Sequence, residues 1–224
     1  MTAIFEDRID AGRRLAQAVL GYRGDTTIVL GLPRGGVPVA RQVADALGAP
    51  LDVVGIRKLG SPRHPEFAVG AIGEDGVRVV DPDALSSMRV SEAELAQVEL
   101  RERAELARQM ARFRAERPRF DLTGKRAIVV DDGVATGATA AAACRAVRQL
   151  GADEIVLAVP VAPPDWVETL AGAADAFVAV ATPHPFWAVG EWYVRFGQTT
   201  DDEVIACLDW VLPTSGHTGQ RRGD

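Results

Sequence analysis

The stretch Lys125-Arg126-Ala127-Ile128-Val129-Val130-Asp131-Asp132-Gly133-Val134-Ala135-Thr136-Gly137-Ala138-Thr139 decides the fold of this chain. Its first part is a short run of mostly β-branched apolar residues, which is typical of a strand buried on both faces of a parallel sheet. Two adjacent carboxylates follow. A loop of small residues and threonines then leads into an alanine-rich helix from about Thr139 to Leu150, which Gly151 ends. The unit is therefore a strand, an acid pair, a loop and a helix.

The loop of this unit predicts an anion site. Its amides lie at a helix N-terminus, where free N–H groups and the positive end of the helix dipole favour negative charge. Asp131 and Asp132 would repel a phosphate, so they need a partner with hydroxyl groups or a metal. A ribose 5-phosphate meets both conditions, with its 2′- and 3′-hydroxyls on the aspartates. The predicted phosphate-binding residues are Ala135, Thr136, Gly137, Ala138 and Thr139.

The segment from Val129 to Thr139 resembles the phosphoribosyl diphosphate (PRPP) signature of type I phosphoribosyltransferases. An apolar strand, two acids and a Thr-Gly-x-Thr loop occur in the order of that signature. An ordinary strand-to-helix turn with a polar cap is the alternative. A P-loop would need a lysine after Gly137, and a phosphoaspartate phosphatase would need acids one residue apart. Neither pattern is present.

The resemblance extends from about Thr26 to Tyr193. It implies an α/β fold with an open, mainly parallel central sheet flanked by helices, a flexible hairpin loop and a small C-terminal hood. It also implies Mg²⁺-dependent transfer of ribose 5-phosphate from PRPP to a nitrogen acceptor, with release of pyrophosphate. The ion would be held mainly by PRPP, with no direct protein ligand, and Asp131 and Asp132 would reach it through water.

Composition narrows the class of protein. The chain has 224 residues, 47% of them hydrophobic, and a net charge of −6. This predicts one domain over residues 1–212 and a disordered tail over 213–224. The acidic balance argues against nucleic-acid binding. No apolar run approaches the ~20 residues of a membrane span, and the first residues lack a signal pattern, so we expect a cytoplasmic protein.

A second strand–turn–helix unit precedes the central one. The strand at 26–30 is followed by Gly31-Leu32-Pro33-Arg34-Gly35-Gly36-Val37-Pro38 and a helix to Leu47. The Gly35-Gly36 pair allows a positive φ or an unusual peptide geometry. Its amides and Arg34 suit a second anion, and in the resembled family the equivalent loop holds pyrophosphate. A tight turn with a surface arginine is the alternative.

The segment from Arg57 to Phe67 is basic and rich in proline and glycine, so it predicts a mobile loop rather than a strand. It follows a strand expected at 51–56, and a hairpin is expected around Gly73-Glu74-Asp75-Gly76. Arg57 and Lys58 suit a pyrophosphate leaving group. They resemble the basic start of the family's flexible catalytic loop.

A capping box at Ser91-Glu92-Ala93-Glu94 opens a long helix to about Glu116. It has one apolar stripe and one charged, solvated side, which is typical of a cover helix. A homodimer through this helix stays open. Further strands are expected at 154–159 and 176–181, a turn at 160–164, and helices at 8–20, 165–170 and 201–212.

Four aromatic residues gather in the stretch from Thr182 to Tyr193, in a chain that is only 6% aromatic. Phe186 and Trp187 suit stacking on a flat base. Purine-salvage enzymes have a similar aromatic-Val-Gly-Tyr stretch in the hood over the base. Packing of these rings on the sheet edge is an equal alternative.

The predicted catalytic residues are Arg57, Lys58, Asp131 and Asp132. Two positions depart from the family: Ala135 stands where 6-oxopurine enzymes have an acid, and Gly133 replaces a bulky apolar residue. The nitrogenous acceptor therefore stays open. A non-catalytic PRPP-sensing regulator on the same fold is the alternative function. A sugar-phosphate hydrolase is a third class, for which the sequence offers no nucleophile or metal cluster.

Overall fold

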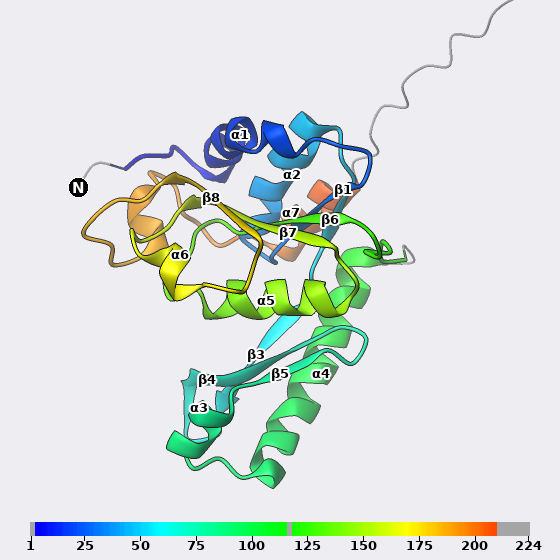
Figure 1. Cartoon of the computed structure of the whole chain (residues 1–224), viewed down its shortest axis with the longest axis vertical. Helices are drawn as coiled ribbons and strands as arrows, with labels where there is room; N and C mark the ends of the chain where they lie inside the picture. Colours follow the sequence, from blue (N-terminus) through cyan, green and yellow to red (C-terminus); the bar gives the residue numbers. More distant parts are fainter. Residues whose placement is uncertain (1–2, 116–117, 210–224) are drawn as a thin grey trace, which may run out of the picture.

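The computed structural model describes residues 3–115 and 118–209, and it shows an α/β fold built on a five-stranded parallel sheet. The strand order is β2-β1-β6-β7-β8, with the strand of the acid pair at the centre (Figure 1). The predicted fold class is therefore confirmed. The strands are β1 (Thr27–Gly31), β2 (Leu51–Val53), β6 (Arg126–Val130), β7 (Glu154–Val161) and β8 (Ala176–Ala181).

The central strand explains this architecture. β6 pairs in parallel with β1 on one side and β7 on the other, and Ala127 to Val130 are completely buried. A strand with apolar residues at successive positions needs cover on both faces. Helices α1 (Arg8–Ala18) and α2 (Gly36–Leu47) cover one face, and α5 (Ala138–Gln149) and α6 (Trp166–Thr169) cover the other (Figure 1).

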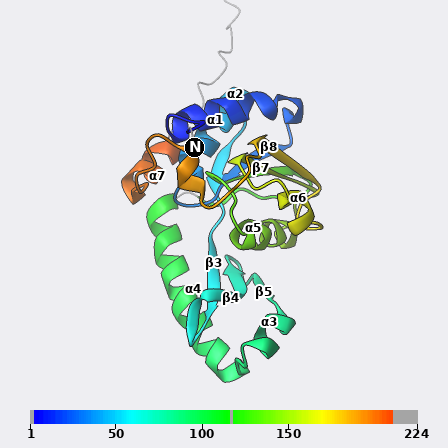
Figure 2. The same ribbon diagram turned by 90° about the vertical axis from the view of Figure 1, so that its left-hand side faces the viewer.

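A second, smaller sheet projects from the main body, with β3 (Ile56–Ser61), β4 (His64–Gly73) and β5 (Arg78–Val80) antiparallel in that order (Figure 2). The expectation of a loop without strands at 57–67 is therefore wrong, because most of this segment lies in paired strands. Leu59, Val69 and Ile72 form an apolar cluster with the long helix, and this burial stabilises the hairpin. The expected hairpin at Gly73–Gly76 is confirmed as the β4–β5 connection.

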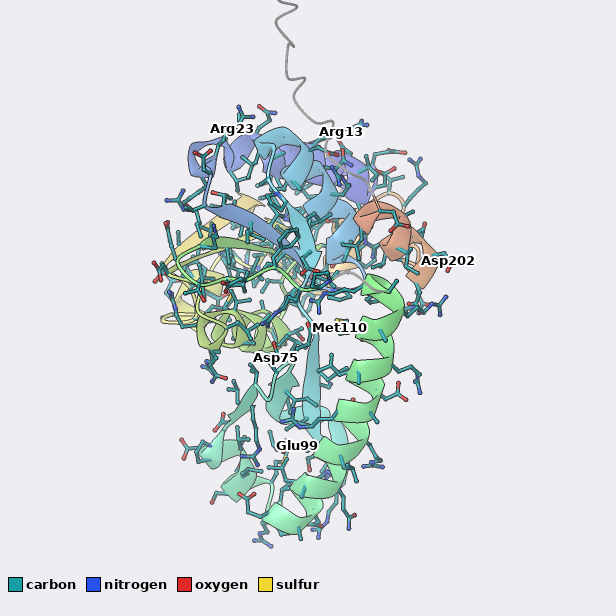
Figure 3. The ribbon with its side chains drawn as sticks, turned by 90° about the vertical axis from the view of Figure 1, so that its right-hand side faces the viewer. Arg13, Arg23, Asp75, Glu99, Met110 and Asp202 are labelled. Carbon is teal, nitrogen blue, oxygen red and sulfur yellow. The ribbon has the colours of Figure 1, made fainter. Side chains whose placement is uncertain are left out.

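The long helix α4 (Glu92–Arg114) has the predicted capping box, and its apolar stripe is buried. It does not cover the parallel sheet, however. It packs beside the hairpin and then against α7 (Asp201–Leu208); Figure 3 labels Met110 near the upper end of α4 and Asp202 on α7. The predicted end at Glu116 lies outside the described residues. The remaining elements are η1 (Leu20–Tyr22), α3 (Pro82–Ser87) and η2 (Val189–Trp192).

A buried ion-pair network joins the two sheets. Arg114 Nε donates to Asp52 Oδ1 at 2.9 Å, and the same guanidinium pairs with Glu74 and donates to the carbonyl oxygen of Val53 at 2.7 Å. These contacts fix the end of α4 on β2, where the chain leaves the parallel sheet. The strand expected at 51–56 is therefore divided: β2 ends at Val53, and Ile56 begins β3.

Other boundaries differ less. The turn expected at 160–164 begins later, because β7 continues to Val161 and pairs there with Ala181. Cys144 is buried, and burial raises the pKa of its thiol to about 12. No helix in the described part of the chain is long and apolar enough to cross a membrane. The predicted tail at 213–224 lies outside that part.

Candidate functional site

The Gly35-Gly36 turn after β1 and the turn that follows β6 lie against each other at the carboxyl edge of the sheet. A Cβ on Gly36 would lie 2.5 Å from the carbonyl oxygen of Val130 and 2.8 Å from the Cα of Asp131. A Cβ on Gly35 would lie 2.0 Å from Asp132 Oδ2. Only glycine permits this approach. The structure thus brings the Gly35-Gly36 turn and the acid pair together, although they are far apart in the sequence.

The first turn contains a cis peptide bond, but this bond does not lie at the glycine pair, where an unusual peptide geometry was expected. The peptide bond between Pro33 and Arg34 is cis. Neither glycine of the turn has a positive φ, since Gly35 is at −61° and Gly36 begins α2. The expectation of a positive φ here is therefore wrong, and close approach to β6 explains the glycines instead.

Asp132 has a cationic partner from the N-terminal helix. Arg8 Nε donates to Asp132 Oδ2 at 2.8 Å, and both side chains are largely buried. Arg8 Nη1 also donates to the carbonyl oxygen of Gly197 at 2.6 Å, and its guanidinium stacks 4.1 Å from the ring centroid of Phe196. One carboxylate of the pair is thus neutralised within the chain, and Asp131 is left as the carboxylate without an arginine contact among the described residues.

Burial raises the pKa of both acids. The pKa of Asp131 lies well above its ordinary value, because the group is desolvated and because Asp132 places a second negative charge beside it. Desolvation also raises the pKa of Asp132, against the opposing charge of Arg8. Two adjacent carboxylates in one desolvated place resist simultaneous ionisation. A hydroxyl-bearing or cationic ligand would favour their charged forms.

Tyr193 anchors the acid pair from the C-terminal segment. Its hydroxyl donates to the backbone carbonyl oxygen of Asp132 at 2.5 Å, and its ring contacts Phe5 at a centroid distance of 5.4 Å. Burial, together with the negative charge of Asp132, raises the pKa of this phenol. The hydroxyl is therefore a fixed donor that holds the turn after β6.

The predicted phosphate loop surrounds a cavity of about 190 Å³. Gly137 has a φ of +76°, which a residue with a side chain rarely adopts, and α5 begins at the next residue. The α5 N-terminus therefore opens into this cavity. The described lining residues are Asp131, Gly133, Val134, Ala135, Thr136, Gly137, Ala138, Thr139, Ala140 and Val189.

The departure at Gly133 has a structural reason. A Cβ at this position would lie 2.5 Å from Cγ1 of Val189 and 3.0 Å from Cγ1 of Val161. Val189, at the start of η2, fills the space that a bulky residue at 133 would occupy. The C-terminal segment thus reaches the phosphate loop, as the hood prediction requires.

Two larger cavities lie beside α4. One of about 900 Å³ is lined by Arg57, Lys58 and Thr139 together with residues of β3 and α4. The other, of about 540 Å³, is lined by Arg34 and again Arg57. The structure thus connects all three predicted basic residues through adjoining cavities.

Two of these basic residues, Arg57 and Arg34, have acidic partners on α4 and α7. Arg57 donates to Glu102 Oε2 from Nε at 2.8 Å and pairs with it through Nη2 at 2.7 Å. Arg34 lies 3.7 Å from Asp201, which also pairs with Arg112 at 2.7 Å. A bound polyanion would have to replace these carboxylates at the guanidinium groups.

The two predicted base-stacking rings have different environments. Phe186 is partly buried against the cluster of Phe5, Val161 and Trp192, with its ring 6.0 Å from that of Trp192. Trp187 is 73% exposed. Packing therefore accounts for Phe186, and Trp187 is the ring that remains accessible. The stacking role stays a prediction.

The sequence did not reveal two residues that contact Asp132, nor the side of α4 that lines the cavities. Arg8 and Tyr193 come from the ends of the chain, and no local pattern connects them with Asp132. The cleft-facing side of α4 did carry a signal, because Arg101, Arg108 and Arg112 are spaced for one helix face. This spacing is equally typical of a solvated helix side.

Comparisons with known proteins agree with this geometry. The model of the family described as "Phosphoribosyl transferase domain" matches residues 2–170. The Mycobacterium tuberculosis H37Rv protein named "Putative phosphoribosyl transferase Rv0571c" is 55% identical over 206 residues, 92% of this chain and 46% of that protein. The chain thus spans about half the length of this relative.

Among solved structures, TT1426 from Thermus thermophilus is 46% identical, with a TM-score of 0.80 and coverage of 91% of this chain and 97% of that one. A purine phosphoribosyltransferase from Pyrococcus horikoshii is more distant, at 20% identity and a TM-score of 0.41, over 80% of this chain and 87% of that one. From the family match and its close relatives, the chain belongs to the phosphoribosyl transferase domain family.

Proposed function

We propose that this protein transfers the 5-phosphoribosyl group of PRPP to a nitrogen acceptor and releases pyrophosphate. One observation carries the proposal: the acid pair after β6, the α5 N-terminus and the Gly35-Gly36 turn meet at one edge of the sheet. Open α/β sheets bind ligands outside the carboxyl ends of their strands. A sugar with a phosphate at one end and a pyrophosphate at the other matches this arrangement.

Each end of PRPP has its own group of residues. The 5-phosphate would accept hydrogen bonds from the amides and hydroxyls of residues 135–139. The ribose hydroxyls would donate to Asp131, with Asp132 held by Arg8 behind it. A negative carboxylate below the ring also favours the positive charge that develops on the sugar as the leaving group departs.

The leaving pyrophosphate gains negative charge in the transition state. Arg34, Arg57 and Lys58 line the cavities beside the Gly35-Gly36 turn and would stabilise that charge. Arg57 would exchange its contact with Glu102 for one with the pyrophosphate. The hairpin of β3 and β4, which carries Arg57 and Lys58, would also shield the site from water and so limit hydrolysis of PRPP.

Mg²⁺ would be bound at this site chiefly by the substrate. No group of three or more acidic, histidine or cysteine residues that could hold a metal occurs in the described part of the chain. Asp131 and Asp132 supply carboxylate oxygens, which would contact Mg²⁺ through water. When bound, the ion would neutralise pyrophosphate charge and aid its departure.

Calorimetry with PRPP and Mg²⁺ tests the binding step. We expect binding by the wild type and a strong loss in Asp131→Asn/Asp132→Asn. For the chemical step, Lys58→Ala should slow release of pyrophosphate by on the order of 10²-fold, as for other lost transition-state donors, with little change in PRPP affinity. Equal PRPP affinity in the double variant would refute the site.

A non-catalytic PRPP-sensing regulator is a second candidate, and the ion pair of Arg57 with Glu102 favours it, because a catalytic arginine is engaged within the protein. Phosphorus NMR separates the two functions. An enzyme slowly releases pyrophosphate from PRPP, faster with a suitable nitrogen acceptor, whereas a regulator binds PRPP and leaves it intact across a nucleobase panel.

A further inference from the structure

Helix α4 has a polar row that lines the cavities, and its arginines are also exposed to solvent. Arg101, Glu105, Arg108 and Arg112 follow one another at intervals of four, three and four residues, which places them on one side of a helix. All four line one or both of the cavities beside α4. The opposite stripe of the helix is buried.

The cavities adjoin one another and the cavity of the phosphate loop. Arg57 and Glu105 line both the cavity of about 900 Å³ and that of about 540 Å³. Thr139 lines the larger cavity and also the cavity of the phosphate loop. A ligand in the larger cavity would therefore lie beside PRPP.

Basic residues outnumber acidic residues in the lining of the two cavities beside α4. Three acidic residues line the two cavities, against six basic ones, although the whole chain has a net charge of −6. Clefts lined by one sign of charge concentrate ligands of the opposite sign. The six basic residues are Arg34, Arg57, Lys58, Arg101, Arg108 and Arg112.

Two polar groups in the larger cavity have no partner among the described residues. Ser61 is 1% exposed, and its hydroxyl makes no hydrogen bond within that part of the chain. Arg101 makes no ion pair or hydrogen bond there either. A buried hydroxyl without a partner is unfavourable, so a ligand in the cavity toward which the Ser61 side chain turns would satisfy this donor.

The row is longer than the pyrophosphate of PRPP requires. Arg101 and Arg112 are about 16 Å apart along the helix axis at a rise of ~1.5 Å per residue. A pyrophosphate held at the Gly35-Gly36 turn would occupy the end near Arg112 and leave Arg101 and Ser61 without an anion. We infer that the cavity between β3 and α4 is an anion site separate from the PRPP site. This second site binds the phosphate group of a small molecule beside PRPP.

The inference rests on the proposed function only in assigning PRPP to the neighbouring loops. Its test is a titration of inorganic pyrophosphate, with Mg²⁺ in excess, into the protein already saturated with PRPP. We expect one further equivalent to bind, and to bind more weakly as salt is raised. If the titration shows no heat of pyrophosphate binding, and pyrophosphate does not compete with any bound ligand, the second site is refuted.

Variants place that equivalent in the cavity. Arg101→Gln should weaken the second binding event about 10-fold, the loss typical of one charge-assisted contact, and leave PRPP affinity unchanged. Ser61→Ala should weaken it without lowering the thermal stability of the free protein, because the removed hydroxyl has no partner there. Arg13→Gln is the matched control, since Arg13 is exposed on α1 at the far side of the molecule (Figure 3).

The outcomes separate the two proposals. Second-site binding that is unchanged in both Arg101→Gln and Ser61→Ala refutes the inference while the PRPP assignment stands. Pyrophosphate binding that depends on Arg101 in a protein that does not bind PRPP supports the inference and refutes the proposed function.

The phosphate could belong to the acceptor or to an effector. O-phosphoethanolamine, a nitrogen compound with a phosphate, and inorganic phosphate serve as probes in phosphorus NMR with PRPP. Consumption of the former together with PRPP identifies a phosphorylated acceptor. A changed PRPP affinity without consumption of either probe identifies an effector, and both results support the site.

Discussion

The close contact between the two turns predicts a sharp effect of Gly36→Ala. The new Cβ would lie 2.5 Å from the carbonyl oxygen of Val130 and 2.8 Å from the Cα of Asp131. Both are backbone atoms at the end of the central strand, so no side-chain rotation can relieve the overlap. The end of β6 must move away from α2, and the acid pair moves with it.

The magnitude follows from two opposing terms. Overpacking of this kind costs about 1–3 kcal/mol, and alanine recovers up to ~1 kcal/mol in a helix relative to glycine. We expect a net loss of about 1–2 kcal/mol of unfolding free energy. For a chain of this size, that lowers the midpoint of thermal unfolding by roughly 2–8 °C.

Gly21→Ala is the control, because a Cβ added to Gly21 would have nothing within 4 Å and the φ of this glycine is not positive. Thermal and urea unfolding of both variants, with PRPP calorimetry, provide the measurement. Gly21→Ala should match the wild type within ~0.5 kcal/mol. If Gly36→Ala unfolds at the same temperature as Gly21→Ala and binds PRPP normally, the contact between the turns is not the reason for this glycine.

Three further predictions concern charge at the site. Burial raises the pKa of Asp131 above the ordinary value of 3.8, so the folded state holds this proton more tightly than the unfolded chain, and stability falls as pH rises through the two values. In urea unfolding, Asp131→Asn should therefore be more stable than the wild type near neutral pH, but not well below pH 3.8. The same stability difference at both pH values would contradict the raised pKa of Asp131. Arg8→Gln should cost about 1–3 kcal/mol, and a double-mutant cycle with Asp132→Asn should show coupling, whereas additive losses would mean that the ion pair contributes nothing. Glu102→Gln should tighten pyrophosphate binding up to about 5-fold by freeing Arg57, and weaker binding in calorimetry would show that Glu102 instead orients that arginine.

Local patterns were enough for the central unit. The apolar run before Asp131 predicted a buried parallel strand, and the glycine and threonines after it predicted a loop at a helix start. Both predictions depend on short-range effects. A strand buried on both faces lacks the alternation of apolar and polar residues, and helix termini need small or polar residues. β6 and α5 lie where these rules place them.

Composition misled where tertiary packing overrides local preference. The prolines, glycine and charges between Arg57 and Phe67 predicted a loop, yet burial of Leu59 and Val69 against α4 holds this segment in strands. β propensity depends on neighbours more than on sequence. The long helix was likewise recognised correctly as a helix, but its position beside the hairpin depends on contacts made at a distance.

The sequence by itself determined the fold class, the family resemblance and the two loops of the site. Only the tertiary structure decided which groups share that site: Arg8 at Asp132, Glu102 at Arg57, and the arginine row of α4 across the cavities. The physical reason is one of range. Strand, cap and turn preferences act over a few residues, whereas the pKa of a carboxylate and the charge of a cleft depend on groups that only folding brings within a few ångströms.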